Sequence, residues 1–233
     1  MNASNQQQVL NLQLTPANTF DSFYPGKDQT LISVLKSVAS GILLEPQVFL
    51  WGSDKTGKTH VLQAMCHVAT STQKRVMYLP MQLLSQQEPS SISELQDLDI
   101  VCIDDVHVIA NQPEWEKALF NFINDQRDQD TVLVFSSASS PSEKLFTLPD
   151  LNSRALWGPV YKLNALLDED LDIALQMHAK SRGLDISIEV QNYMLTHFQR
   201  DVSSIVNMLE KLDQASLQEQ RRVTIPFLKK VLA

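Results

Sequence analysis

The feature that most constrains this chain is an eight-residue segment that fits the pattern G-x-x-x-x-G-K-[ST]. Its residues are Gly52, Ser53, Asp54, Lys55, Thr56, Gly57, Lys58 and Thr59. An apolar β-type run (QVFLW, 47–51) precedes the segment and an amphipathic stretch follows it, which is the strand–loop–helix context in which this pattern binds phosphate. The glycines let backbone N–H groups and the helix dipole converge on a phosphate. We therefore predict a nucleotide site in which Lys58 reaches the β- and γ-phosphates and Thr59 ligates Mg²⁺.

Two carboxylates at the end of another apolar run, DIVCIDD (99–105), supply the expected second half of this site. Asp104 is expected to hold the Mg²⁺ shell, and Asp105 stands where a water-activating carboxylate would be. The side chain of Asp105 is shorter than a glutamate, which suits that role less well. Taken alone, the two residues could simply cap a strand, but the phosphate loop about 50 residues upstream favours a nucleotide site.

The chain divides into three parts. Residues 1–17 are polar and Gln-rich and are expected to form a flexible tail. Residues 18–163 alternate apolar strands with helices, which predicts an α/β domain with a mainly parallel sheet covered on both faces. Residues 164–233 show helical spacing throughout and predict a small helical domain. The expected strands are 47–52, 75–80, 99–104 and 131–137, and the expected helices of the α/β domain include 58–70 and 113–127.

Composition excludes several classes of protein. The chain has 233 residues, of which 43% are hydrophobic and 20% charged, which is typical of a soluble globular protein. Its net charge of −8 argues against a broad nucleic-acid surface. No apolar run is long enough for a membrane span, and no secretory signal is evident, so we expect an intracellular protein. Cys66 and Cys102 fall in predicted core segments and are expected to be reduced thiols.

These motifs resemble the AAA+ superfamily and, within it, the DnaA/Hda family of replication-initiation proteins. The resemblance spans nearly the whole chain; it rests on TFDSFYPGK (19–27), the phosphate loop, VCIDDVHVIA (101–110), LPDLNSRALWGPVYKL (148–163) and VTIPFLKKVL (223–232). It implies an AAA+ P-loop NTPase base domain with a C-terminal helical lid, bound ADP or ATP with Mg²⁺, and a cytoplasmic protein associated with the nucleoid and replisome. Phe23 and Tyr24 belong to a segment that lines the base pocket in this family, although they could equally be core residues.

The Ser153-Arg154 pair matches the family's arginine-finger motif. An isolated arginine here would be an ordinary surface residue at a helix end. The resemblance implies that Arg154 acts in trans on the ATP held by DnaA, and it leaves open a homo-oligomer. The tryptophans Trp51, Trp115 and Trp157 are expected to be packing residues.

Two departures from the family pattern concern the chain's own nucleotide. The lid position that usually carries a phosphate-sensing arginine is Ser203, and only Arg200 is near. The polar sensor after the fourth strand is replaced by Ala138, unless Ser136, Ser137 or Ser139 substitutes. Loss of both contacts weakens discrimination between triphosphate and diphosphate. We therefore expect a structurally held diphosphate and slow or absent turnover of ATP.

Leu10, Leu12 and Leu14 alternate with polar residues in the tail. The family has a short tail motif, Gln-Leu-x-Leu-x-Leu, that docks on the DNA polymerase III sliding clamp (β subunit). Strict spacing puts Val9 at the glutamine position, and Gln8 fits with one extra residue. The resemblance implies clamp binding through residues 8–14, and the alternative is a tail strand that folds onto the domain.

The expected function is a nucleotide-bound regulator that, with the sliding clamp, promotes hydrolysis of DnaA-bound ATP and so represses re-initiation of replication. The alternative is an autonomous AAA+ ATPase of the helicase-loader type that works through Lys58, Asp104 and Asp105. A third interpretation, a DNA-binding initiator fragment, is disfavoured by the acidic charge and by a sequence that stops after the lid. We therefore expect no sequence-specific DNA binding by the chain itself.

Overall fold

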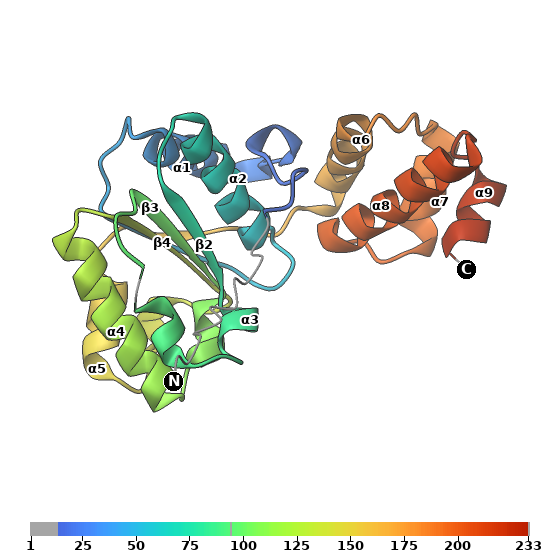
Figure 1. The fold of residues 1–233 in the computed structure, drawn as a ribbon. Coiled ribbons are helices and arrows are strands. Elements are labelled where there is room, and N and C mark those ends of the chain that lie inside the picture. Colours follow the sequence, from blue (N-terminus) through green and yellow to red (C-terminus); the bar gives the residue numbers. More distant parts are fainter. Residues whose placement is uncertain (1–13, 94, 233) are drawn as a thin grey trace, which may run out of the picture.

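The computed structural model describes residues 14–93 and 95–232, which form an α/β base and a helical lid (Figure 1). The base contains a five-stranded, wholly parallel sheet with strand order β2-β3-β4-β1-β5. Four strands agree with the prediction to within one residue, and the short β5 was not predicted. The strands are β1 (Gln47–Trp51), β2 (Val76–Pro80), β3 (Ile100–Asp104), β4 (Val132–Ser137) and β5 (Val160–Lys162).

Helices cover both faces of the sheet, as expected for parallel strands (Figure 1). On one face lie α1 (Gln29–Ser40) and α2 (Lys58–Ser71), and on the other lie α3 (Met81–Leu84), α4 (Pro113–Asp128) and α5 (Pro149–Ala155). Short 3-10 segments join these elements at Phe20–Ser22, Gly26–Asp28, Pro89–Ile92, Val106–Ile109 and Pro141–Glu143.

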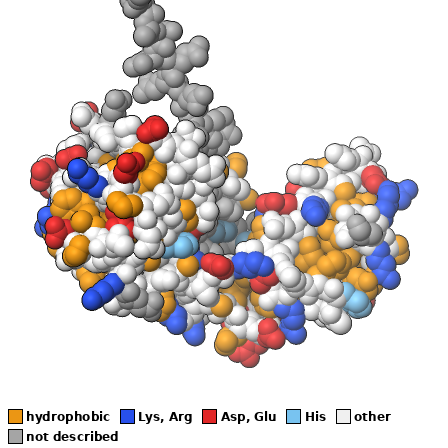
Figure 2. Space-filling view, turned by 90° about the horizontal axis from the view of Figure 1, so that it is seen from below, with side chains coloured by type: hydrophobic (Ala, Val, Ile, Leu, Met, Phe, Trp, Pro, Cys, Tyr) orange, Lys and Arg blue, Asp and Glu red, His pale blue; other side chains and the backbone are white. Residues whose placement is uncertain are grey.

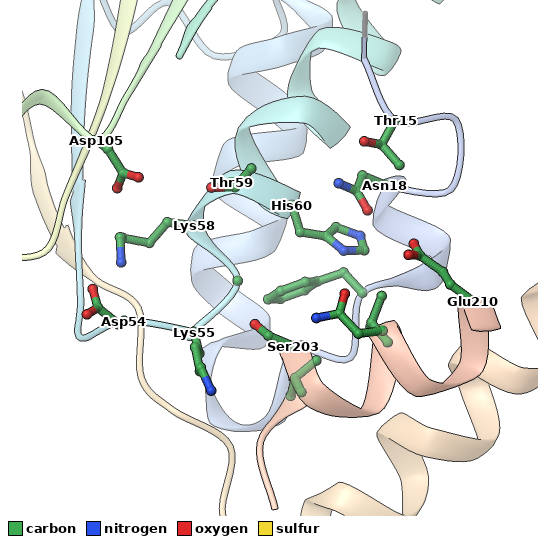
Figure 3. A pocket seen from close by; sticks show the side chains of 15 residues that line it. Thr15, Asn18, Asp54, Lys55, Lys58, Thr59, His60, Asp105, Ser203 and Glu210 are labelled. Carbon is green, nitrogen blue, oxygen red and sulfur yellow. The ribbon is translucent and has the colours of Figure 1, made fainter. Parts of the chain in front are cut away.

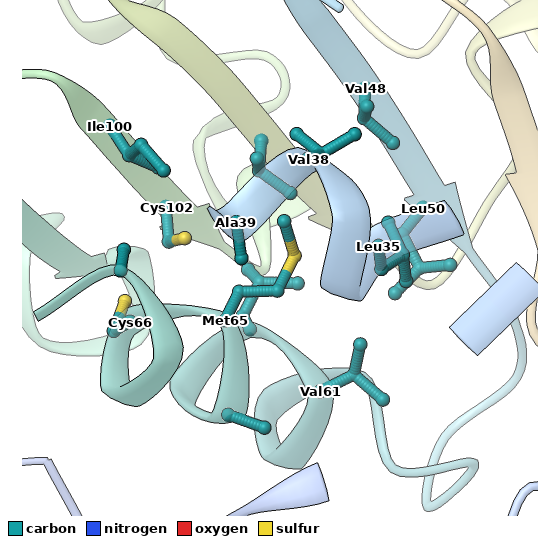
Figure 4. Packing of buried hydrophobic residues seen from close by; sticks show 14 of the residues in the cluster. Leu35, Val38, Ala39, Val48, Leu50, Val61, Met65, Cys66, Ile100 and Cys102 are labelled. Carbon is teal, nitrogen blue, oxygen red and sulfur yellow. The ribbon is translucent and has the colours of Figure 1, made fainter. Parts of the chain in front are cut away.

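Alternation along the strands builds the two cores. Val48 and Leu50 of β1 pack with α1 and α2, whereas Phe49 between them packs with the α4 side. Figure 4 shows the first of these clusters, in which Cys66 of α2 and Cys102 of β3 lie with their sulfurs between helix and sheet. Both cysteines are free and buried, as predicted. Every residue of the interior strand β3 is buried, because helices pack on both faces of the sheet at this strand.

The lid consists of α6 (Leu171–Ser181), α7 (Ile188–His197), α8 (Val202–Glu219) and α9 (Ile225–Leu232), after a 3-10 turn at Asp168–Asp170. It has its own apolar core, centred on Leu175, Ile205 and Leu209. The lid lies beside α2 and far from α4 and α5 (Figure 1). Lid contacts therefore fall on the side of the base where the phosphate loop begins α2.

The first described residues lie on α2. The backbone N–H of Thr15 donates to Gln63 Oε1 at 3.0 Å, Asn18 Nδ2 donates to the same oxygen, and His67 Nε2 lies 3.1 Å from the Thr15 carbonyl oxygen. Leu14 packs partly buried against the α1–α2 core. Residues 14–17, which we expected in the tail, thus belong to the surface of the base, because their backbone polar groups find partners on α2.

The tryptophans differ in environment. Trp115 is buried and Trp51 is partly buried, as expected of packing residues. Trp157 is 41% exposed, so the expectation that it packs inside is wrong. Among the described residues, no helix has both the length and the apolar character needed to cross a membrane.

Candidate nucleotide-binding site

The phosphate loop runs from the end of β1 into α2, and its backbone carbonyl groups surround the ammonium group of Lys58. Lys58 is only 6% exposed, and its Nζ donates to the carbonyl oxygens of Gly52 (2.9 Å) and Ser53 (3.0 Å). Gly57 has φ +95°, and a Cβ there would lie 2.7 Å from Phe23 Cε2. Glycine is therefore required at this position for both conformation and space. The loop holds a buried ammonium that can exchange carbonyl partners for phosphate oxygens.

Oxygen ligands suited to Mg²⁺ converge beside this loop. The Thr59 hydroxyl donates to Asp104 Oδ2 at 2.7 Å, so the two predicted metal-binding residues lie side by side. Tyr78 donates to the same oxygen at 2.7 Å, and Ser136 donates to Asp104 Oδ1. Mg²⁺ in nucleotide sites takes one or two protein oxygens together with phosphate oxygens, which this pair can provide. No cluster of three or more His, Cys, Asp or Glu arranged for a metal occurs in the described part of the chain.

Asp105 follows directly in the left-handed conformation, with φ +56°. Its backbone N–H donates to Ser136 Oγ at 2.8 Å, and its carboxylate lies 3.9 Å from His107 Nδ1. Burial, together with the charge of Asp104, raises the pKa of Asp105. A half-buried carboxylate with a raised pKa is suited to accept a proton from water.

A cavity of about 360 Å³ lies between the phosphate loop and α8 of the lid, within the size range of ligand sites. Figure 3 shows Lys55, Lys58 and Thr59 on one side of it and Ser203 and Glu210 of α8 on the other. The molecular surface is hollowed between the base and the lid (Figure 2). The cavity is thus lined by two parts of the chain that are distant in sequence.

The structure brings most of the predicted binding residues to this cavity. Those that line it are Phe23, Asp54, Lys55, Gly57, Lys58, Thr59 and Asp105. Tyr24 and Thr56 instead line a smaller adjoining void, and the Tyr24 hydroxyl donates to Asp170 Oδ1 of the lid at 3.1 Å. Gly52 and Ser53 contribute through their carbonyl oxygens to Lys58.

The two expected sensor positions carry no cation. Ser203 lines the cavity, and the Ala138 backbone N–H donates to His107 Nδ1 at 3.2 Å. Arg200, the nearest lid arginine in sequence, pairs with Asp168 at 3.6 Å and does not line the cavity. Its positive charge is therefore directed elsewhere.

The lid is tied to the phosphate loop by an ion pair. Lys55 Nζ lies 3.1 Å from Asp201 Oδ2, and Asp201 also caps α8 by accepting from the Ser204 N–H at 2.9 Å. This contact joins a residue of the loop to the first turn of the helix that closes the cavity. The ion pair therefore helps to hold α8 at the position where it lines the cavity.

Sequence reasoning missed several polar residues near the site. Tyr78 and the histidines His60 and His178 reach it only through the packing of β2, α2 and α6. The Nδ1 atom of His178 is buried without a hydrogen-bond partner, and burial, with His60 nearby, lowers the pKa of His178 to about 4. Of the residues near the site that were not predicted to bind, only Ser136 was indicated by the sequence, as one of the serines that could replace the missing polar sensor.

Arg154 lies at the end of the sheet opposite the phosphate loop, near the start of β1. Its carbonyl oxygen accepts from Gln47 Nε2 at 2.8 Å, and Gln47 begins β1, whereas the phosphate loop leaves from the other end of that strand after Trp51. Four residue steps of strand separate the two edges by about 13 Å. The guanidinium stacks on the ring of Trp157, 3.5 Å from its centroid. The predicted finger residue is therefore anchored at the end of β1 away from its own phosphate loop.

The predicted clamp-binding residues are only partly covered. Gln8, Val9, Leu10 and Leu12 lie outside the described residues. Leu14, the last residue of the motif, packs partly buried against the base.

A parallel sheet in this strand order, with a phosphate loop after β1, an acidic residue ending β3 and a helical lid, defines an AAA+ P-loop protein. Two family models divide the chain between them: the bacterial DnaA ATPase domain matches residues 14–162, and the Hda lid domain matches residues 168–232. The chain therefore belongs to the DnaA/Hda family. An uncharacterized protein of Haemophilus influenzae is 35% identical to it over 229 residues, which are 98% of this chain and 99% of the relative.

Solved structures agree on the fold. Domain III of the Thermotoga maritima replication initiation protein DnaA superposes with a TM-score of 0.79 at 22% identity, covering 94% of this chain and 97% of that one. DnaA from Aquifex aeolicus bound to AMPPCP gives a TM-score of 0.69 at 21% identity, covering 89% and 71%. The RuvB branch migration motor of Thermotoga maritima gives 0.64 at 15% identity, covering 92% and 71%.

Proposed function

We propose that this chain is a nucleotide-bound regulator of replication initiation that, together with the sliding clamp, promotes hydrolysis of the ATP held by DnaA and so represses re-initiation. One observation carries the proposal. The backbone of Arg154 is hydrogen-bonded at the end of β1 opposite the chain's own phosphate loop, which favours a role for this arginine on another protein's nucleotide. An arginine supplied in trans can accelerate phosphoryl transfer on the order of 10³-fold or more.

The chain's own site supports a holding role. Lys58, Thr59 and Asp104 are arranged to bind the phosphates and Mg²⁺ of ADP or ATP. Ser203 and Ala138 supply no cation at the sensor positions, and the cations that line the described cavity both come from the phosphate loop. The missing lid arginine favours slow turnover, because charge developing on the γ-phosphate has fewer partners.

The partners follow from the family and the tail. Membership in the DnaA/Hda family supports DnaA as the protein whose nucleotide Arg154 reaches. The alternating leucines of residues 8–14 suit an extended peptide that binds in an apolar groove, here that of the polymerase III β clamp. We propose a site of action at the replisome, with binding of the tail to the clamp bringing Arg154 to DnaA.

Phosphate release with ATP and Mg²⁺ tests this proposal, measured with the chain alone and then with ATP-loaded DnaA and clamp on DNA. We expect release in the mixture to exceed the sum of the separate proteins and to fall at least 100-fold with Arg154→Ala. Arg222→Ala, an exposed lid arginine, is the matched control and should leave release unchanged. Undiminished stimulation by the Arg154→Ala chain would refute the proposal.

The same assay tests the alternative of an autonomous ATPase, which the raised pKa of Asp105 beside Asp104 favours. That function requires phosphate release by the chain alone at ordinary ATPase rates. It also requires that Lys58→Ala abolish the release and that DnaA be unnecessary.

A further inference from the structure

Trp157 lies between two arginines. The Cζ of Arg154 is 3.5 Å from the centroid of its ring, and the Cζ of Arg127, in the last turn of α4, is 3.8 Å from the same point. Two guanidinium groups this close to one centroid cannot share a face of the ring, because they would overlap. They must therefore lie on opposite faces, with the indole between them.

The backbone around this stack is held firmly. Gln47, only 4% exposed, donates to the carbonyl oxygens of Arg154 and Ala155. Gly158, directly after the tryptophan, passes so close to β1 that a Cβ on it would lie 2.0 Å from the Gln47 carbonyl oxygen. The backbone on both sides of Arg154 and Trp157 therefore contacts the start of β1.

From this geometry we propose that Trp157 is a positioning residue that holds the guanidinium of Arg154 ready for the nucleotide of the partner, with Arg127 closing the stack from the other side. The inference rests on the proposed function. Stacking uses the flat face of a guanidinium and leaves its in-plane N–H donors free to bind phosphate oxygens. An unstacked arginine would have to give up its rotamer freedom when it contacts the phosphates, which lowers the fraction of bound complexes in which the guanidinium is correctly placed.

The exposure of Trp157 fits this role better than a packing role. A large ring that served only to fill the core would be buried, as Trp115 is. Trp157 instead leaves two-fifths of its surface in solvent, and an arginine packs against each face of its ring. Arg127 is also well placed electrostatically, because a cation near a helix C-terminus is favoured.

The first test uses the chain alone and does not depend on DnaA. Nitrogen relaxation at Arg154 Nε measures how rigidly the guanidinium is held. We expect its order parameter to fall in Trp157→Ala, to fall less in Trp157→Phe, which keeps an aromatic face, and to fall in Arg127→Ala. An order parameter that stays unchanged in both alanine variants overturns the inference.

The second test measures stimulated hydrolysis of DnaA-bound ATP. We expect the maximal rate to drop about 2- to 5-fold with Arg127→Ala and more with Trp157→Ala, on the scale of an exposed cation–π contact. The concentration for half-maximal stimulation should stay the same, and Trp157→Phe should restore most of the rate. Equal rates for Trp157→Phe and Trp157→Ala, or a loss that follows only a lowered unfolding midpoint, would mean that the ring is merely structural.

Arg154→Ala separates the two proposals. If this variant abolishes stimulation while the Trp157 and Arg127 variants do not reduce it, only the positioning role fails. If Arg154→Ala itself leaves stimulation intact, the proposed function fails, and the relaxation measurement still decides whether Trp157 holds the guanidinium. Arg127 is exposed, so Arg127→Ala keeps the test decisive even if Trp157→Ala folds poorly.

Discussion

Glu116 is a buried carboxylate on α4 that organises the entry to α5. It is 1% exposed and accepts four hydrogen bonds: from the N–H groups of Asn111 (2.8 Å), Thr147 (3.1 Å) and Leu148 (2.7 Å) and from the Thr147 hydroxyl (2.7 Å). Leu148 is the residue before α5 and has no side-chain cap of its own. Glu116 therefore anchors the backbone that leads into the helix that carries the predicted finger.

We predict that Glu116→Gln lowers the free energy of unfolding by roughly 2–5 kcal/mol. Each carboxylate oxygen of Glu116 accepts two hydrogen bonds. In glutamine one of these oxygens is replaced by an NH₂ group, which cannot accept them. Whichever way the amide is oriented, two donors of the protein lose their acceptor. Each buried donor left unpaired costs about 1–3 kcal/mol. Glu114→Gln, two residues earlier in α4 and exposed, is the matched control and should change stability by less than about 0.5 kcal/mol.

Urea unfolding at pH 7, followed by circular dichroism, measures the difference, and repeating it at lower pH adds a second check. Burial alone would raise the pKa of Glu116, but the bonds from Thr147, Leu148 and Asn111 outweigh it and leave the pKa below its ordinary value. A lowered folded-state pKa stabilises the native chain above the unfolded-state value and loses that contribution as pH falls through the folded one. The gap between wild type and Glu116→Gln should therefore narrow in acid. A difference under 1 kcal/mol at pH 7 would refute the reasoning.

Three further predictions concern the site and the lid. Gly57→Ala should abolish binding of a fluorescent ADP analogue, because the new Cβ meets Phe23 at 2.7 Å at φ +95°; near-normal affinity would contradict this. Asp201→Ala removes the cap of α8 and the ion pair to Lys55, and should lower stability by about 0.5–2 kcal/mol in thermal or urea unfolding; an unchanged midpoint would speak against it. The pKa of His178 is lowered to about 4, so the unfolded chain takes up its proton first as pH falls below 6.5, and wild type should lose about 2 kcal/mol by pH 5 from this residue. His178→Leu should flatten that part of the stability profile, and an unaltered profile would show that the residue does not titrate as described.

The fold class and half of the site were predictable because they rest on local signals. The phosphate loop needs its glycines, lysine and threonine in consecutive positions, since the backbone itself forms the phosphate cradle. The strands were visible as short apolar runs because a parallel sheet is buried on both faces. Asp104 was recognisable because it ends such a run, and the structure places its carboxylate 2.7 Å from the Thr59 hydroxyl.

The remaining features depend on contacts between distant segments, for which a single sequence carries no signal. Trp157 is only a tryptophan in a loop until α4 brings Arg127 to its second face. Glu116 looks like a helix-surface glutamate until the loop before α5 folds over it.

By itself, the sequence determined the local chemistry: a phosphate loop, a metal carboxylate, a parallel sheet and a helical C-terminal part. Tertiary structure alone decided which lid residues face the nucleotide cavity, how the base anchors residues 14–17, and that Arg154 sits at the edge of the sheet away from its own phosphate loop. The physical reason is that local motifs are encoded by neighbouring residues, whereas side-chain partnerships are selected only when apolar burial has brought remote segments together.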